Sequence, residues 1–315
     1  MRIGWVGFHQ EGLPALDALL AEGAVVGVMT LVPELAAKRS AVGDYHALCA
    51  RHGVPLQEVA QINDERSLEF MRAWNADVIF VIGWSQILGE AALAIPRVGM
   101  VGAHASLVPH NRGSAPINWA ILNGEHETGN TLMWLASDVD GGDIIDQIAF
   151  PITPYDTCAS LYEKVAETNK RMILEAVAQF RKGVFPRRPQ GNSNQHFLPR
   201  RRPEDGLIDW TRDAPALYRF VRALTRPYPG ARCHHQGRCW HVWQAVLVEL
   251  PAPPQALPGT VIGALRSPEP GACGILVGCG VGVLGILEMT DDGGEVLAGP
   301  ALCDEFPKGV RFQHE

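Results

Sequence analysis

The sequence contains no CxxC pair, no GxGxxG string and no apolar run long enough to cross a membrane. Without the GxGxxG spacing, Gly4, Gly7 and Gly12 give no reason to infer a dinucleotide cofactor. The seven cysteines are scattered, which gives no support to a zinc site and favours free thiols in a cytoplasmic protein. The longest apolar stretch, residues 272–287, is broken by five glycines and predicts two strands. We therefore expect a soluble, cytoplasmic protein that does not enter a membrane.

Positive charge is also scarce. The chain has 27 Lys and Arg residues against 34 Asp and Glu residues, a net charge of -7. No global basic field would therefore attract nucleic acid. The content of 47% hydrophobic and 19% charged residues is ordinary for a globular protein and excludes disordered and fibrous classes. A length of 315 residues suggests two domains, at roughly 150 residues each.

The first 150 residues alternate strand-like and helix-like segments. Apolar runs occur at residues 2–8, 24–30, 77–83, 99–105, 131–136 and 144–150. This alternation predicts an α/β fold with a mostly parallel sheet covered by helices on both faces. The clearest helix is expected at residues 160–182. Ligands of such sheets usually bind beyond the carboxyl ends of the strands.

The remainder of the chain has a different pattern. Residues 186–205 are rich in Pro, Gly, Asn and Arg and predict a linker. A short helix is expected at residues 215–224, followed by short strand-like runs separated by Gly and Pro. These runs predict a small antiparallel barrel of about five strands.

A histidine and an aspartate occupy two predicted strand ends. His104 ends a buried strand, and Asp140 lies in a loop with glycines on its carboxyl side. A carboxylate beside an imidazole fixes the tautomer of the ring and favours its protonated form, so the pair could carry a proton or stabilise negative charge. The residues alone leave open that His104 is an ordinary buried, hydrogen-bonded histidine.

Four ordered strings surround this pair. The chain resembles the formyltransferases that use 10-formyltetrahydrofolate, whose pattern is Asn-x-His-x-Ser-Leu-Leu-Pro, Arg-Gly-x-x-Pro, Glu-Thr-Gly-x-Thr and Asp-x-Gly-(Asp/Glu)-Ile. The matching residues are His104, Ser106, Leu107, Pro109, Arg112, Gly113, Pro116, residues 127–129, Thr131, Asp140, Gly142, Asp143 and Ile144. The resemblance implies a one-carbon transferase with a Rossmann-like catalytic domain at residues 1–189, a linker at 190–205 and an OB-like β-barrel at 206–315.

The same resemblance implies roles for individual residues. His104 matches the catalytic histidine and Asp140 the carboxylate that supports it; no metal is expected. Folate would contact Gln86, Ile87, Leu88, Ser106, Leu107, Val108, Pro109, Ser114, Ala136, Ser137, Asp138 and Val139. The acceptor would contact Trp84, Asn111, Arg112, Arg200, Arg201, Arg222 and Arg226. For the arginines, the alternative is a solvated linker and an exposed helix face.

One position departs from the family pattern. The family Asn, two residues before the histidine, is Gly102 here. That amide normally helps to hold the oxyanion formed when an amine attacks the formyl carbon, and losing one such donor typically costs about 100- to 1,000-fold in rate. Three explanations are open: His104 with a water or a backbone N–H replaces the amide, the glycine makes room for a bulkier substrate, or formyl transfer has been lost and a folate-binding module remains.

The acceptor is predicted from short segments. Residues 30–44, where a tRNA-binding loop would lie, carry only Lys38 and Arg39 against Glu34 and Asp44, a poor clamp for phosphates. Residues 200–210 and 221–231 look more like the UDP-4-amino-4-deoxy-L-arabinose formyltransferase. We therefore expect the amine of a nucleotide-linked amino sugar, a small molecule, as the acceptor, with nucleic acid disfavoured and a homodimer possible. The alternatives are methionyl-tRNA or another amine, such as a peptide or antibiotic intermediate.

A second group of side chains could bind metal. His234, His235, Cys239 and His241 lie close together in the sequence. In a hairpin their side chains would alternate between the two faces, so surface or packing roles are favoured over a metal site.

Overall fold

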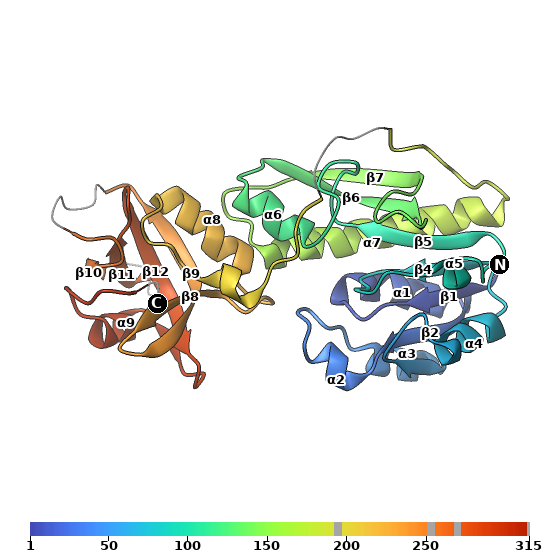
Figure 1. The fold of residues 1–315 in the computed structure, drawn as a ribbon, viewed down its shortest axis with the longest axis horizontal. Coiled ribbons are helices and arrows are strands. Elements are labelled where there is room, and N and C mark those ends of the chain that lie inside the picture. The colour runs from blue at the N-terminus through green and yellow to red at the C-terminus, as the bar shows by residue number, and fades with distance from the viewer. Residues whose placement is uncertain (192–196, 251–255, 268–271, 314–315) are drawn as a thin grey trace. The chain divides into compact units, whose positions relative to one another are not determined.

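The computed structural model describes residues 1–315 except 192–196, 251–255, 268–271 and 314–315 (Figure 1). Part of the expected linker, residues 192–196, therefore lies outside the described residues. The chain divides into two compact units. The first contains Met1–Ile117, His126–Thr153 and Ser160–Arg200, and the second contains Asn118–Glu125, Pro154–Ala159 and Arg201–Glu315. The domain boundaries expected from the sequence stay a prediction.

A seven-stranded sheet forms the centre of the first unit, with the order β3-β2-β1-β4-β5-β6-β7. The strands are β1 (Ile3–Val6), β2 (Val25–Leu31), β3 (Leu56–Val59), β4 (Val78–Val81), β5 (Gly99–His104), β6 (Glu127–Trp134) and β7 (Ile144–Pro151). The first five strands are parallel, whereas β6 runs antiparallel to β5, and β7 antiparallel to β6. The predicted Rossmann-like, mostly parallel sheet is confirmed.

Helices cover both faces of this sheet. They are α1 (Leu13–Ala21), α2 (Pro33–Ala36), α3 (Tyr45–His52), α4 (Glu65–Ala73), α5 (Glu90–Leu93) and α7 (Cys158–Arg181), with a short 3₁₀ turn at Gln10–Gly12. Most of α6 (Pro116–Leu122) belongs to the second unit. One core cluster joins α1, α3 and α7 to one face, and another joins α4 and α5 to the opposite face. In the described part of the chain, no helix is long and apolar enough to span a membrane.

Neighbouring residues of a strand pack on opposite faces of the sheet, because successive side chains leave a strand on opposite sides. Trp5 and Phe80 enter the cluster with α1 and α7, whereas their neighbours Val6 and Ile79 enter the cluster with α4. Gly4 of β1 and Gly27 of β2 leave space for Trp74, a residue of this second cluster. A Cβ atom at Gly27 would lie 1.9 Å from Nε1 of Trp74, so the indole packs directly on the strand where a side chain is missing.

The second unit is built on an antiparallel sheet. Its strands are β8 (Ala231–His235), β9 (Arg238–Val248), β10 (Val261–Leu265), β11 (Gly274–Gly278), β12 (Val283–Asp291) and β13 (Val296–Ala298). Its helical elements are α8 (Ala214–Leu224), α9 (Pro300–Glu305) and a 3₁₀ turn at Pro203–Gly206. Five strands pair in the order β10-β11-β12-β9-β8, and β13 pairs with β12. β8 is absent from the apolar runs, because it carries Arg232, His234 and His235, but the hairpin considered for residues 231–235 and 239–243 is present.

The last described residues join the two edges of this sheet. Val261 N donates to the carbonyl of Val310 over 2.8 Å, and Phe312 N donates to the carbonyl of Gly259 over 2.9 Å, beside β10. At the opposite edge, Gln313 N donates to the carbonyl of His234 in β8 over 2.8 Å. A closing segment of this kind satisfies edge groups that would otherwise be unpaired, and it makes the sheet barrel-like as expected.

Candidate active site

β5 carries His104 to the end of the sheet, between β4 and β6. Its side chain is only 9% exposed. Nδ1 lies 3.6 Å from Oδ1 of Asp140, and Nε2 lies 2.8 Å from the carbonyl oxygen of Asn111. Both neighbouring atoms are acceptors: the carbonyl of Asn111 lies at hydrogen-bond distance and the carboxylate of Asp140 at ion-pair distance. The structure therefore brings the predicted pair together.

Asp140 reaches His104 by an indirect path. Because β6 is antiparallel to β5, Trp134 pairs beside Val101, near the start of β5, whereas Thr131 pairs with His104. The loop after Trp134 must therefore run back along β5 before Asp140 can contact the histidine. Gly113 N donates to Oδ2 of Asp140 over 2.9 Å, which helps to fix the carboxylate at the end of this path.

Gln190 holds the same loop from the other side. Its Nε2 donates to the carbonyls of Asp140 and Gly142 over 2.8 and 2.7 Å. Its Oε1 accepts from Nε of Arg112 over 3.0 Å. Sequence reasoning missed Gln190 and placed it in the linker, because the residues it contacts are far away along the chain. Arg112, expected to touch the acceptor, uses its guanidinium here to support the loop of Asp140.

The segment after His104 is fixed by its own polar groups. The fully buried Ser106 donates its hydroxyl to the carbonyl of His110 over 2.7 Å, and its carbonyl accepts from Oγ1 of Thr131 over 2.6 Å. Val108 is buried against Met133. Ser106 and Val108 therefore shape the loop from inside.

The loop after β4 is tied to residues 60–63. Oε1 of Gln86 accepts from Ile62 N over 2.8 Å, and its Nε2 donates to the carbonyl of Ala60 over 2.7 Å. Asn63 donates to the carbonyl of Ile87 over 2.9 Å and accepts from Gly89 N over 2.8 Å. Ile87 remains 68% exposed. The side chain of Gln86 and the carbonyl of Ile87 are thus occupied, and the side chain of Ile87 stays exposed.

The other residues expected to contact folate occupy varied surroundings. Residues 136–139 are exposed, Ser114 and Leu107 are half-buried, and Leu88 packs against the cluster around α4. Trp84 also packs there, with its ring centroid 6.0 Å from that of Phe8. Its buried Nε1 has no hydrogen-bond partner among the described residues. These roles stay predictions.

Three of the expected acceptor arginines belong to the second unit. Arg201 lies over Trp119, with 5.2 Å between its Cζ and the ring centroid, and donates to the carbonyl of Asp205. Arg222 is buried and donates to the carbonyl of Asp156, and burial lowers the pKa of its guanidinium. Arg226 pairs with Glu288 over 2.6 Å.

Arg201, Arg222 and Arg226 therefore already contact protein groups. Two other residues expected to contact the acceptor lie in the first unit: Arg200 is exposed, and Asn111 is buried, with its carbonyl accepting from His104.

The space beside Gly102 is filled. A Cβ atom at this position would lie 2.5 Å from Cδ2 of Leu135, the residue at the start of the loop that leads to Asp140. The glycine therefore does not open room for a bulkier substrate along this direction, since the Leu135 side chain lies there. Sequence reasoning did not identify this pairing.

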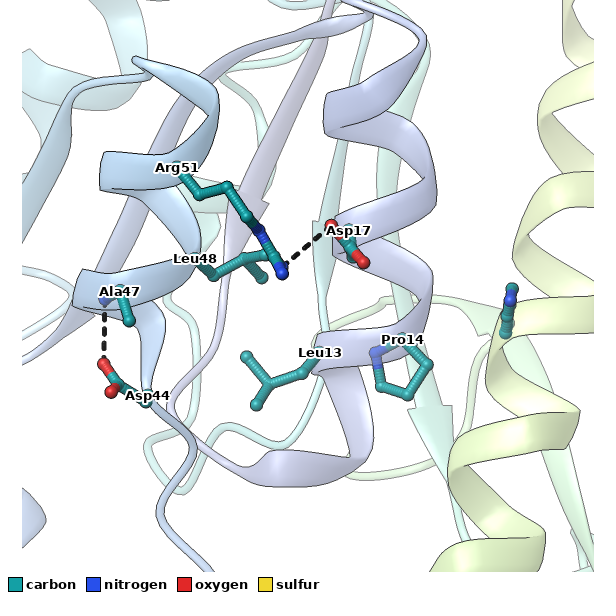
Figure 2. Close-up of a pocket in the computed structure, with 8 residues that line it drawn as sticks. Leu13, Pro14, Asp17, Asp44, Ala47, Leu48 and Arg51 are labelled. Carbon is teal, nitrogen blue, oxygen red and sulfur yellow. Dashed lines mark hydrogen bonds and ion pairs between the residues drawn. The ribbon is translucent and has the colours of Figure 1, made fainter.

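A hollow of about 540 Å³ lies elsewhere in the first unit, between α1 and α3 (Figure 2), and Lys170 of α7 is among the residues that line it. Leu13 and Leu48 supply apolar surface, and Arg51 pairs with Asp17 across it over 3.1 Å. Its lining includes none of the residues expected to bind folate or the acceptor.

Comparison with known proteins identifies the family of this chain. Residues 11–177 match the model of the formyl transferase family, and residues 201–307 match that of the formyl transferase C-terminal domain. The chain belongs to the formyl transferase family. A methionyl-tRNA formyltransferase from Citrifermentans bemidjiense is 32% identical over 95% of this chain and 93% of its own. Three further relatives of that name are 29–32% identical.

Solved structures share the fold of this formyl transferase. HypX from Aquifex aeolicus, in complex with tetrahydrofolic acid, has a TM-score of 0.67 at 22% identity. The match covers 98% of this chain and 48% of that protein, so the chain spans about half the length of HypX. WlaRD, a sugar 3N-formyl transferase crystallised with dTDP and 5-N-formyl-THF, has a TM-score of 0.63 at 15% identity, covering 91% and 97% of the two chains.

These relatives overturn the expected acceptor. The prediction of a nucleotide-linked amino sugar rested on two short arginine-containing strings and on the weak charge of residues 30–44. The relatives that share about 30% of their residues over most of the chain are methionyl-tRNA formyltransferases, and the sugar formyltransferase shares the fold at only 15% identity. Local strings are weaker signals than similarity along the whole chain. The prediction is therefore wrong, while the predicted transferase class and family are confirmed.

Proposed function

We propose that this formyl transferase moves the formyl group of 10-formyltetrahydrofolate to the amino group of methionyl-tRNA. The contact of His104 with Asp140 at the end of β5 is the observation that carries the proposal. The acceptor is proposed from the relatives of this name that match nearly the whole chain. A cytoplasmic location goes with this reaction and is part of the proposal.

The donor supplies an activated formyl carbon, and the chain supplies the polar groups around it. The attacking amine must lose a proton, and the carbonyl oxygen gains negative charge as the new C–N bond forms. Neutral His104 can accept the proton of the amine at Nε2 if this nitrogen exchanges the carbonyl of Asn111 for a reacting atom. The protonated ring can then stabilise the oxyanion and give the proton to the folate nitrogen that leaves when the old C–N bond breaks. Asp140 stays in contact with Nδ1 and so holds the orientation of the ring.

Two loop segments fit a folate next to this pair. Residues 86–88 follow β4, the neighbour of β5, and their loop is fixed by Asn63 and Gln86. Residues 136–139 belong to the loop that ends at Asp140. Ile87 and residues 136–139 are exposed, and backbone groups of such loops suit the hydrogen-bonding edge of a pterin. We therefore place the pterin at these segments.

A direct assay tests the reaction and the acceptor separately. The full chain is incubated with 10-formyltetrahydrofolate and initiator tRNA charged with methionine. We expect release of tetrahydrofolate in step with formation of formylmethionyl-tRNA. Uncharged tRNA and the His104→Gln variant are the negative controls.

Each outcome decides a different part of the proposal. Release of tetrahydrofolate with another amine but not with methionyl-tRNA would overturn the acceptor and leave the transfer reaction intact. No release with any amine, although a folate analogue binds, would overturn the reaction itself.

A further inference from the structure

We propose that Cys239, His241 and Asp292 in the second unit form a binding site for a divalent metal ion of the zinc type. One ligand atom from each residue, a thiol sulfur, an imidazole nitrogen and a carboxylate oxygen, lies within 4.8 Å of the others. This site is separate from the residues proposed for formyl transfer. It does not depend on the proposed reaction.

The fold explains why these three side chains meet. Cys239 and His241 are two positions apart on β9, so they leave the strand on the same face. Asp292 follows β12, and β12 pairs with β9 so that Thr290 lies opposite His241. The turn that carries Asp292 is fixed by Asp291, whose Oδ1 accepts from Gly293 N and Gly294 N over 3.0 and 3.1 Å.

The sequence led us to expect that strand alternation would separate these side chains onto two faces, but most of them share one face. In the β8–β9 hairpin, His234 lies opposite Cys239, and both point to the same face as His241. Alternation removes only His235, whose ring packs against Phe306. The third ligand comes from Asp292, which is far away in the sequence and could not be assigned to this group before the pairing of β9 with β12 was known.

His241 is held in the orientation that suits a metal ligand. Its Nδ1 lies 2.7 Å from the carbonyl of Pro229, which can only accept, so Nδ1 carries a proton. In a neutral ring Nε2 then has a bare lone pair, and it faces Oδ1 of Asp292 at 3.0 Å. Two acceptors at this distance need a cation between or beside them, either a proton on Nε2 or a metal ion.

The remaining contacts stabilise this orientation. The indole of Trp243 stacks on the imidazole with 5.8 Å between ring centroids and 12° between the planes. A carbonyl on the second nitrogen and a packed ring are the usual supports of a metal-binding histidine.

Cys239 adds a thiol, a metal-ligand type that an ordinary His–Asp ion pair lacks. A divalent ion at this place would displace the thiol proton and offset the charges of the thiolate and the carboxylate. Arg232 lies opposite His241 in the pairing of β8 with β9, and its Nη2 donates to the carbonyl of Pro203.

The ligand set indicates the class of ion. Thiolate, imidazole and carboxylate are the three ligand types that Zn²⁺ takes in proteins, and three protein ligands leave a fourth position for water. Mg²⁺ and Ca²⁺ prefer oxygen ligands throughout and are disfavoured here.

Cobalt substitution tests the site on the full chain. Metal-free protein is titrated with Co²⁺, and we expect thiolate-to-cobalt charge-transfer absorption that saturates at one equivalent and is removed by Zn²⁺ but not by Mg²⁺. Cys239→Ser should abolish the band, whereas Cys303→Ser, a change at another partly exposed cysteine, should preserve it. Asp292→Asn should weaken Co²⁺ binding about tenfold or more, because even the loss of a residue that only supports a metal ligand has an effect of this size. Asp304→Asn is the matched control for an exposed carboxylate.

A second measurement covers variants that fold poorly. Alkylation of Cys239 in the unmodified chain is followed by mass spectrometry with and without Zn²⁺, and we expect Zn²⁺ to slow it at least tenfold. The proposal is overturned if the wild-type chain lacks the band or the protection of Cys239, if the band persists in Cys239→Ser, or if Zn²⁺ slows alkylation of the other cysteines equally. In that case His241 and Asp292 form an ion pair with a proton on Nε2.

Discussion

At the residue scale, His104 is held by two oxygen atoms on opposite sides of its ring. The carbonyl of Asn111 contacts Nε2 and the carboxylate of Asp140 lies near Nδ1. These contacts fix the orientation of a ring that can exchange a proton and stabilise an oxyanion. The short distances to fixed loops mean that a small change at either neighbour alters the position of the imidazole.

Replacing His104 tests its role directly. His104→Gln keeps a side chain of similar size that cannot carry a proton, and we expect kcat to fall about 100- to 10,000-fold, the usual contribution of general acid–base catalysis. Binding of a folate analogue, measured by calorimetry, should change little. His46→Gln, at an exposed histidine paired with Glu58, is the control and should keep full activity. A near-normal kcat for His104→Gln would remove the histidine from the mechanism.

Gly102 and Leu135 should behave as a coupled pair. Gly102→Asn places a Cβ atom 2.5 Å from Cδ2 of Leu135, so we expect a loss of about 1–3 kcal/mol of unfolding free energy from overpacking. Combining it with Leu135→Ala should recover part of this loss. Urea unfolding of both single variants and the double variant measures the coupling, for which contacting residues give about 0.5–3 kcal/mol. Strictly additive effects would mean that the two side chains do not compete for the same space.

At the scale of elements, the loop after β4 depends on residues outside it. Asn63 makes two hydrogen bonds to this loop, one to the carbonyl of Ile87 and one from Gly89 N. The loop is therefore positioned before any ligand arrives, which reduces the ordering cost of binding.

Asn63 gives a test of this preorganisation. We expect Asn63→Ala to raise the KM for 10-formyltetrahydrofolate about twofold to tenfold, the equivalent of losing a net hydrogen bond of about 0.5–1.5 kcal/mol, with kcat changed less. Asn63→Asp keeps the acceptor for Gly89 N and loses only the donation to Ile87, so its effect should be smaller. An unchanged KM in Asn63→Ala would show that the loop orders without this side chain or does not hold folate.

At the scale of the whole molecule, buried thiols occur in both units. Burial raises the pKa of Cys49 to about 11, of Cys158 to about 12 and of Cys279 to about 11, from 9.0. An unfolded chain releases these protons near pH 9, whereas the folded chain keeps them. The stability that these groups contribute is therefore fully present below pH 9 and is lost as the pH rises toward 11–12.

Alkaline unfolding tests this linkage. Between pH 9 and 11 the free energy of unfolding in urea should fall, by up to roughly 1.4 kcal/mol per pH unit for each such thiol. Cys158→Ala should reduce this slope, and below pH 8 the slopes of the variant and the wild type should coincide. Equal slopes above pH 9 would show that the Cys158 thiol ionises as easily in the folded chain as in the unfolded one.

Much of the architecture could be predicted from short-range patterns. Alternating apolar segments indicated the parallel part of the sheet, and the ordered strings around His104 and Asp140 indicated the family. The reversed direction of β6 could not be read in this way, because an apolar strand looks the same in either direction. That reversal is why the loop after Trp134 has to return along β5 before Asp140 reaches its partner.

The amino-acid sequence by itself determined the α/β class of the first unit, the strand-rich second unit and the membership in the formyl transferase family. These features depend on residue periodicity and on motifs within a few dozen residues. Only the tertiary structure decided that Gln190 supports the loop of Asp140, that Leu135 fills the space beside Gly102, and that Asp292 joins Cys239 and His241. Such contacts join residues that no local pattern relates, because folding, and not sequence distance, sets which side chains become neighbours.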